Sequence, residues 1–109
     1  QAPAVLAMYR ALGPLVAPLD TTIDSLELEP RGHWHATLAS GAAIELGQGD
    51  EPVLAERLTQ FATTAREVAA RHQRTVADIE TADLRHVGGY ALRLRGVTTM
   101  QAADPRAKR

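Results

Sequence analysis

The sequence predicts an α+β fold, with two helices packed on an antiparallel or mixed β-sheet of about five strands in meander-like order. Two segments repeat apolar residues at helical spacing, whereas the remaining regular segments alternate apolar and polar residues as strands do. Turns that contain glycine or proline separate most of the strands, and strands joined by such short turns are antiparallel neighbours. The order of helix, three strands, helix and two strands is typical of helices layered against one sheet.

The two helices are expected over residues 2–16 and from residue 51 to about residue 72. Gly13-Pro14 kinks or breaks the end of the first helix. Asp50 is the expected N-cap of the second helix, and Pro52 suits its first turn. The apolar stripe of the second helix consists of Leu54, Leu58, Phe61, Ala62, Ala65, Val68 and Ala69.

The strands are expected at residues 23–29, 33–39, 42–46, 76–86 and 89–95. Their alternation, together with the helical stripe, predicts which side chains form the core. The predicted core consists of Leu26, Leu28, Trp34, Leu38, Ile44, Leu46, Leu54, Leu58, Phe61, Leu84, Leu92 and Leu94.

The segment at residues 90–95 is expected to be the last strand and to lie at an edge of the sheet, because only a polar tail follows it. Its alternation places Tyr90 on the core face, and Arg93 and Arg95 outside. An edge strand has unpaired N–H and C=O groups with which another chain can pair. Two interpretations of the arginines stay open: they protect the edge from aggregation, or they attract an acidic partner.

Length, charge and composition restrict the class of protein. The chain has 109 residues, which corresponds to one small domain, and its net charge of −1 argues against a general nucleic-acid surface. It has no cysteine, so thiol catalysis, disulfides and cysteine metal sites are excluded. No apolar run approaches the ~20 residues that span a bilayer. Because the chain begins at Gln1 rather than Met, we expect a fragment of a longer protein.

Motifs that could carry catalysis or bind a cofactor are incomplete. His33-x-His35 places two imidazoles on one strand face, but a zinc site needs three or four ligands, so no metal is expected. Gly47-x-Gly49 before a helix lacks the Gly-Lys-Ser/Thr of a phosphate loop and is expected to be a helix entry. Neither serine lies in a nucleophile motif, and Asp83 with Arg85 is expected to form a structural ion pair.

Several motifs in their order along the chain resemble a known family. They are Leu26-Glu27-Leu28-Glu29, Arg31-Gly32-x-Trp34, Gly41-x-x-Ile44-Glu45-Leu46-Gly47, Leu54-x-x-Arg57-Leu58-x-x-Phe61 and Ala82-Asp83-Leu84-Arg85-x-x-Gly88-Gly89-Tyr90-Ala91-Leu92. This set, which extends from about residue 9 to 95, resembles the C-terminal β domain of the bacterial cell-division protein FtsQ (DivIB). The resemblance implies that residues 1–98 form this β domain without the membrane helix and POTRA domain of the family. Residues 99–109 are expected to be a polar, disordered tail.

The resemblance also implies a function. The family is a non-catalytic scaffold of the divisome, located at the periplasmic face of the inner membrane at the division site. Its β domain binds the FtsB–FtsL complex, and its last strand receives a segment of FtsB by strand addition. No cofactor is implied. The alternative is another envelope binding module that uses the same edge strand, and a small metal-dependent or hydrolytic enzyme is disfavoured.

The resemblance assigns a partner-binding patch in and around the last hairpin. Its expected members are His86, Gly88, Gly89, Tyr90, Arg93, Arg95 and Arg31. His86 stands where many members of the family have an aromatic residue. Arg31 resembles a basic position ahead of the tryptophan that meets an acidic residue of the partner.

Overall fold

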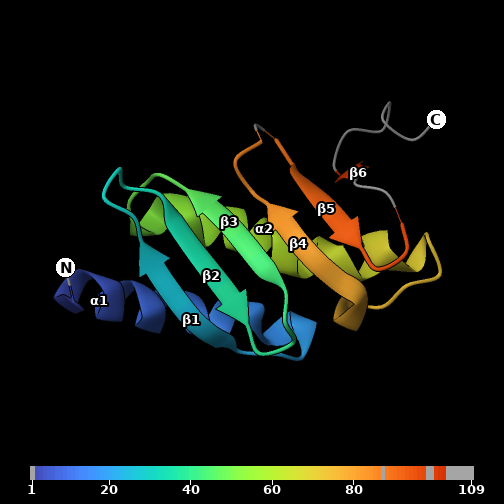
Figure 1. Cartoon of the computed structure of the whole chain (residues 1–109), viewed down its shortest axis with the longest axis horizontal. Helices are drawn as coiled ribbons and strands as arrows, with labels where there is room; N and C mark the ends of the chain where they lie inside the picture. Colours follow the sequence, from blue (N-terminus) through green and yellow to red (C-terminus); the bar gives the residue numbers. More distant parts are fainter. Residues whose placement is uncertain (1, 87, 98–99, 103–109) are drawn as a thin grey trace.

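The computed structural model describes residues 2–86, 88–97 and 100–102, and it confirms the α+β fold (Figure 1). Its α-helices are α1 (Ala2–Leu12) and α2 (Glu51–Ala70), and its 3-10 helices are η1 (Gly13–Leu19) and η2 (Val76–Asp78). Its strands are β1 (Ile23–Leu28), β2 (Trp34–Leu38), β3 (Ala43–Gly47), β4 (Ile79–Asp83), β5 (Tyr90–Leu94) and β6 (Met100–Ala102).

The six strands form one sheet in the order β1-β2-β3-β4-β5-β6, so every strand lies beside its neighbours in the sequence. All pairs are antiparallel except β3 and β4, which are parallel. The parallel pair follows from α2, which connects these two strands and carries the chain back along the sheet. The sheet is therefore mixed, and α2 joins an N-terminal three-stranded part to a C-terminal one (Figure 1).

The expectation that residues 90–95 form the last strand at the sheet edge is wrong. The chain turns back after β5 through Gly96, whose φ is +76°, and the Val97 N–H donates to the Leu94 carbonyl at 2.9 Å. Strand β6 then pairs antiparallel with β5, with Ala102 opposite Tyr90 and Met100 opposite Leu92. The expected tail at residues 99–109 thus contains a short strand, and residues 103–109 lie outside the described residues.

Two other expected elements have different ends. The first helix stops at Leu12, and the chain continues as the 3-10 helix η1 because Pro14 and Pro18 lack the N–H of an α-helical hydrogen bond. The strand expected from residue 76 begins at Ile79. Before it, Thr75 caps the 3-10 turn η2, and its N–H donates to the Asp78 carboxylate at 2.9 Å. A local cap thus replaces the first residues of the expected strand.

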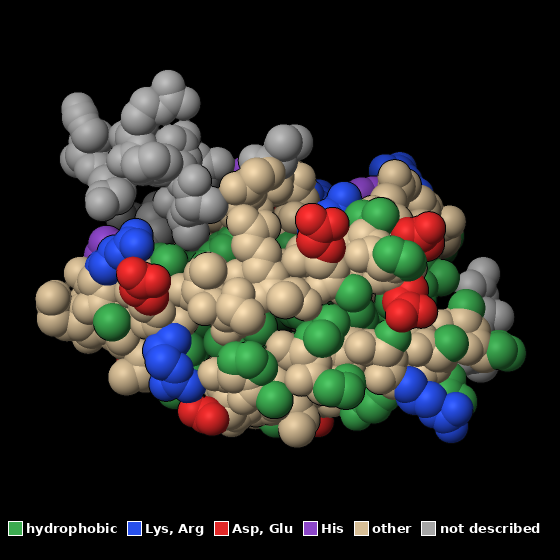
Figure 2. Space-filling view, turned by 180° about the vertical axis from the view of Figure 1, so that it is seen from behind, with side chains coloured by type: hydrophobic (Ala, Val, Ile, Leu, Met, Phe, Trp, Pro, Cys, Tyr) green, Lys and Arg blue, Asp and Glu red, His purple; other side chains and the backbone are tan. Residues whose placement is uncertain are grey.

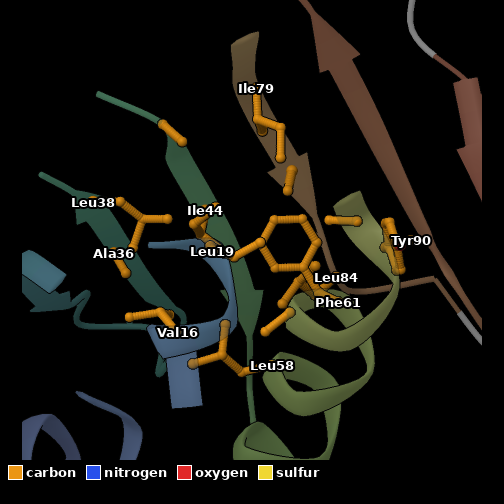
Figure 3. Packing of buried hydrophobic residues seen from close by; sticks show 14 of the residues in the cluster. Val16, Leu19, Ala36, Leu38, Ile44, Leu58, Phe61, Ile79, Leu84 and Tyr90 are labelled. Atoms are coloured by element: carbon orange, nitrogen blue, oxygen red, sulfur yellow. The ribbon is translucent and has the colours of Figure 1, made fainter. Parts of the chain in front are cut away.

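The core lies between the helices and one face of the sheet (Figure 3). Ten of the twelve predicted core residues are buried, whereas Leu26 and Leu28 on β1 are only partly buried and pack against the core. These two lie on the first strand of the sheet, which has a strand neighbour on one side only. The predicted core was taken from the strands and α2 only. It therefore did not include the buried residues of α1 and η1, namely Met8, Leu12, Val16 and Leu19.

The two faces of the sheet differ in polarity. The helical side shows hydrophobic side chains at its surface (Figure 2), among which Leu6 and Tyr9 on α1 and Val53 on α2 are exposed. The opposite face, called here the open face, bears the outward side chains of the strands, such as Thr37, Thr81 and Arg93, which are exposed. The polar residues considered as candidates for function lie mainly on this face and at its edges.

We predict that Leu58→Ala lowers the free energy of unfolding by about 2–5 kcal/mol, because it opens a cavity in the core. Leu58 is 2% exposed and belongs to the apolar stripe of α2 (Figure 3). Urea unfolding followed by circular dichroism measures the change. Val53→Ala on the same helix is the control, because Val53 is 40% exposed and its truncation should cost far less. Equal losses for both variants would contradict the placement of the core.

Candidate functional site

The hairpin between β4 and β5 presents the centre of the expected patch. Leu84 is buried and ties the start of the turn to the core, whereas His86 and Gly88 are exposed. Within the turn, the Gly89 N–H donates to the His86 carbonyl at 3.4 Å. Gly88 has a φ of +74°, a conformation that glycine adopts without strain. The hairpin therefore projects an imidazole and accessible backbone from the end of the sheet.

Tyr90, which is a member of the expected patch, lies in the core. Its ring is 2% exposed and packs edge-on against Phe61, with ring centroids 5.3 Å apart and planes at 87°. Its hydroxyl is hydrogen-bonded to the Thr64 hydroxyl of α2. Burial raises the pKa of the Tyr90 phenol. These contacts attach β5 to α2, so the position of the expected binding strand is set by the core.

The two arginines of the expected patch differ. Arg93 stands opposite Thr81 on the open face and is exposed, and its guanidinium has no ion pair within the described part of the chain. Arg95 lies just beyond β5, and its Nε is 3.5 Å from the Asp78 carboxylate. The backbones of the same two residues are also in contact, since the Arg95 N–H donates to the Asp78 carbonyl at 2.8 Å. Arg93 is thus the arginine whose charge is available to a partner.

The strand register arranges the open face in two rows. One row runs across neighbouring strands through Glu27, His35, Glu45 and Asp83, each opposite the next. The adjacent row has smaller side chains and ends at Arg93; its members are Ser25, Thr37, Ala43, Thr81 and Arg93. A shallow hollow of about 350 Å³ lies over β2, β3 and β4, between the charged row and the small side chains. This face is polar, and acidic and basic side chains do not alternate regularly along its rows.

His33 and His35 pair with carboxylates. The two ring nitrogens of His35 contact Glu29 and Glu45, and His33 Nδ1 is 3.9 Å from Glu45. Each of these side chains is only partly exposed and has an acidic neighbour. Among the described residues, no group of three or more His, Asp or Glu is placed to hold a metal ion.

Arg85 is a candidate site residue that prediction from the sequence treated only as half of an ion pair. The ion pair is confirmed, since the guanidinium donates to both Asp83 oxygens, at 2.9 and 2.8 Å. These hydrogen bonds lower the pKa of Asp83 despite the opposing effect of partial burial. Arg85 also lines a hollow of about 300 Å³ together with Arg31, Glu29, His33, His35 and Glu45. The fold thus places Arg31 and Arg85 at one hollow although they are far apart in sequence.

The end of β3 holds Arg85 and the start of α2 in place. Gly47 has a φ of +81°, and a Cβ there would be 2.8 Å from the Cγ of Arg85, so a larger residue would displace that side chain. Arg57 of α2 donates to the Leu46 and Gln48 carbonyls, at 2.7 and 2.9 Å. Asp50 accepts from the Val53 N–H at 3.5 Å, which confirms the segment as a helix entry. The Asp83-x-Arg85 spacing was the only sequence signal for this arrangement.

We predict that Asp83→Asn makes stability less dependent on pH in the acid range. The folded pKa of Asp83 lies below its ordinary value of 3.8, so its contribution is present above that value and is lost as pH falls through the folded pKa. Melting temperatures from pH 2 to 7 measure the effect. Asp24→Asn is the control, because Asp24 is exposed on β1 and has no ion pair among the described residues. Identical pH profiles for Asp83→Asn and the unmodified chain would contradict this role.

We predict that zinc leaves the melting temperature unchanged. Among the residues that the structure describes, no group of three or more possible ligands that could hold a metal ion forms around His33 and His35. Differential scanning fluorimetry with and without excess zinc is the measurement. A large rise that disappears in His33→Ala would show that the histidine pair binds metal.

Comparisons with known proteins agree with the motifs. The family described as "Cell division protein FtsQ/DivIB, C-terminal" matches residues 1–85. The chain is 33% identical over 101 residues to cell division protein FtsQ of Burkholderia pseudomallei, covering 92% of this chain and 39% of that protein. It is 35% identical over 94 residues to the FtsQ of Thiomonas arsenitoxydans, covering 85% and 34%.

A third relative, the FtsQ of Bordetella pertussis, is 32% identical over 117 residues, which cover 95% of this chain and 42% of that protein. The chain therefore spans between about a third and two fifths of the length of these relatives. None of the described helices is long and apolar enough to cross a membrane. The family match and these identities over most of the chain show that the chain belongs to the C-terminal domain family of the cell division protein FtsQ/DivIB.

Proposed function

We propose that this chain is a non-catalytic binding domain of a divisome scaffold and that it binds the FtsB–FtsL complex by strand addition. The addition takes place at the C-terminal end of the sheet, where β5 and β6 lie. The observation that carries the proposal is an exposed arginine on a strand near the end of the sheet, in a domain of the FtsQ family. Backbone pairing supplies general affinity, and outward side chains supply selectivity.

The geometry of the sheet supports this end as the binding surface. In the described part of the chain, the sheet has strand neighbours on both sides of β2 to β5 and ends at β1 and β6. The C-terminal end is next to the β4–β5 hairpin, whose His86 and Gly88 are exposed. A partner strand lying there would meet the hairpin at one end and Arg93 along its side.

The exposed charge on β5 favours an acidic partner, because Arg93 is exposed and has no ion pair among the described residues. Arg31 and Arg85 line one hollow together with Glu29 and Glu45, so that hollow has charges of both signs. Arg85 is already paired with Asp83, but its side chain remains 50% exposed and can receive a second carboxylate. Arg95 contributes less, because Asp78 lies beside it. Complementary charge mainly increases the rate and selectivity of association.

The family suggests where this binding takes place. We propose that the complete protein is anchored in the inner membrane and that this domain acts on its periplasmic side at the division site. The domain would then bring division proteins together through protein contacts and without chemistry of its own.

Isothermal titration of the chain with the purified periplasmic segment of FtsB–FtsL tests the proposal. The expected result is a saturable heat of binding with a dissociation constant that rises with salt, since charged side chains contribute. A folded chain that binds neither FtsB–FtsL nor the isolated FtsB segment would contradict the proposed function.

We predict that Arg93→Glu weakens this binding about fivefold at low salt. The substitution removes one favourable exposed charge contact and adds a repulsive one, which together amount to about 1 kcal/mol. Arg10→Glu makes the same charge change on α1, away from the sheet end, and should leave the affinity near that of the unmodified chain. Circular dichroism confirms that both variants fold. Equal affinities for the two variants would contradict a role for Arg93 in partner binding.

A further inference from the structure

The strand that a partner would extend is already paired within the chain. Strand β5 has β4 on one side and β6 on the other, so neither of its sides is open along its whole length. We infer that β6 occupies the partner's position on β5 and that an incoming strand displaces it. This inference rests on the proposed function, because it specifies which backbone groups the partner uses.

The length of β6 makes it a weak occupant. It spans three residues, Met100–Ala102, whereas β5 spans the five residues Tyr90–Leu94. The register pairs β6 with the first part of β5 only, up to Met100 opposite Leu92. Short strands contribute few ladder hydrogen bonds and depend on their neighbours for stability. A partner strand that pairs with all of β5 would therefore make more backbone hydrogen bonds than β6 does.

The charge of the position gives a second reason for exchange. Arg93 lies beyond the last described pair between β5 and β6, and it has no ion pair within the described residues. Strand β6 has the sequence Met-Gln-Ala and brings no carboxylate to this side of β5. An acidic partner strand that reaches Arg93 can therefore form a contact that the chain's own strand cannot form.

The contacts of β5 with α2 and β4 hold it in the sheet during such an exchange. Tyr90 is buried against Phe61 and Thr64, while Leu92 and Leu94 are 0% and 1% exposed. On its β4 side, β5 is paired from Leu94 opposite Ile79 to Ala91 opposite Asp83. The turn after β5 is fixed as well, because Arg74 Nε donates to the Arg95 carbonyl at 2.7 Å. Strand β5 can therefore stay in the sheet while β6 leaves.

Displacement has a thermodynamic consequence. If only the chains with β6 released can accept the partner on β5, the apparent dissociation constant is the intrinsic one divided by the released fraction. Weakening β6 should therefore tighten partner binding without any new contact. If the partner paired instead with the outer side of β6, weakening β6 should weaken partner binding, because β6 would then be the strand with which the partner pairs.

The test uses the full chain with Gln101→Pro, and Gln101→Ala as its matched control. Gln101 is the central residue of β6 and stands opposite Ala91. Proline removes a backbone donor and is poorly accommodated in a paired strand, whereas alanine retains the backbone. Melting curves verify that both variants retain the folded core, and amide hydrogen exchange reports on β5 and β6 without any partner.

We expect faster exchange of the β5 amides in Gln101→Pro than in Gln101→Ala, and roughly 3- to 10-fold tighter binding of the FtsB–FtsL periplasmic segment. In the unmodified chain, adding this segment should speed exchange in residues 100–102 while β5 stays protected. Equal exchange in the two variants would show that β6 does not cover β5.

The remaining outcomes separate this inference from the proposed function. Equal affinities, or weaker binding by Gln101→Pro, would overturn the displacement of β6 but leave FtsB–FtsL as the partner. Binding by none of the three chains would overturn the proposed function and this inference together.

Discussion

The whole structure depends on the burial of one apolar stripe of α2 against the sheet. Leu54, Leu58 and Phe61 on this stripe are between 0% and 2% exposed. The same helix is the connection between β3 and β4, and without it those strands could not lie parallel and adjacent. Burial of the stripe therefore joins two three-stranded antiparallel units into one sheet with one core.

This packing also determines which parts of β5 can act at the surface. Phe61 and Thr64 hold the ring and hydroxyl of Tyr90 inside, so the alternation of the strand directs Arg93 to the open face. Strand β5 consequently has a fixed core side and an outward charge. In the displacement that we propose, β5 stays in the sheet and its neighbour β6, which is shorter and pairs with β5 alone, leaves it.

The polar residues of the open face are organised by pairing within the chain. His35 lies between Glu29 and Glu45, and Arg85 binds Asp83 through two hydrogen bonds. Such contacts between partly exposed groups contribute little to stability individually, but they orient side chains. They leave Arg31 and Arg85 at the same hollow, where Glu29 and Glu45 also lie, so this hollow brings basic and acidic side chains together.

The amino-acid sequence alone determined the α+β class, helix α2 with its cap at Asp50, and most of the core. These features depend on local patterns: helical spacing, strand alternation and turn residues act within a few positions. The ordered motifs also identified the family. In contrast, the ion pair between Asp83 and Arg85 was expected, but its place beside Arg31 was not, because it depends on how β2, β3 and β4 align.

Only the tertiary structure decided that β5 is not the end of the sheet. The segment Met100–Ala102 has too few residues for a recognisable alternation, and its strand conformation comes from hydrogen bonding to β5 after the turn at Gly96. The same holds for the partial exposure of Leu26 and Leu28, whose pattern predicts burial but whose strand lies at the end of the sheet. Local periodicity specifies which face of a strand is apolar, whereas its neighbours in space decide what covers that face and what pairs with its backbone.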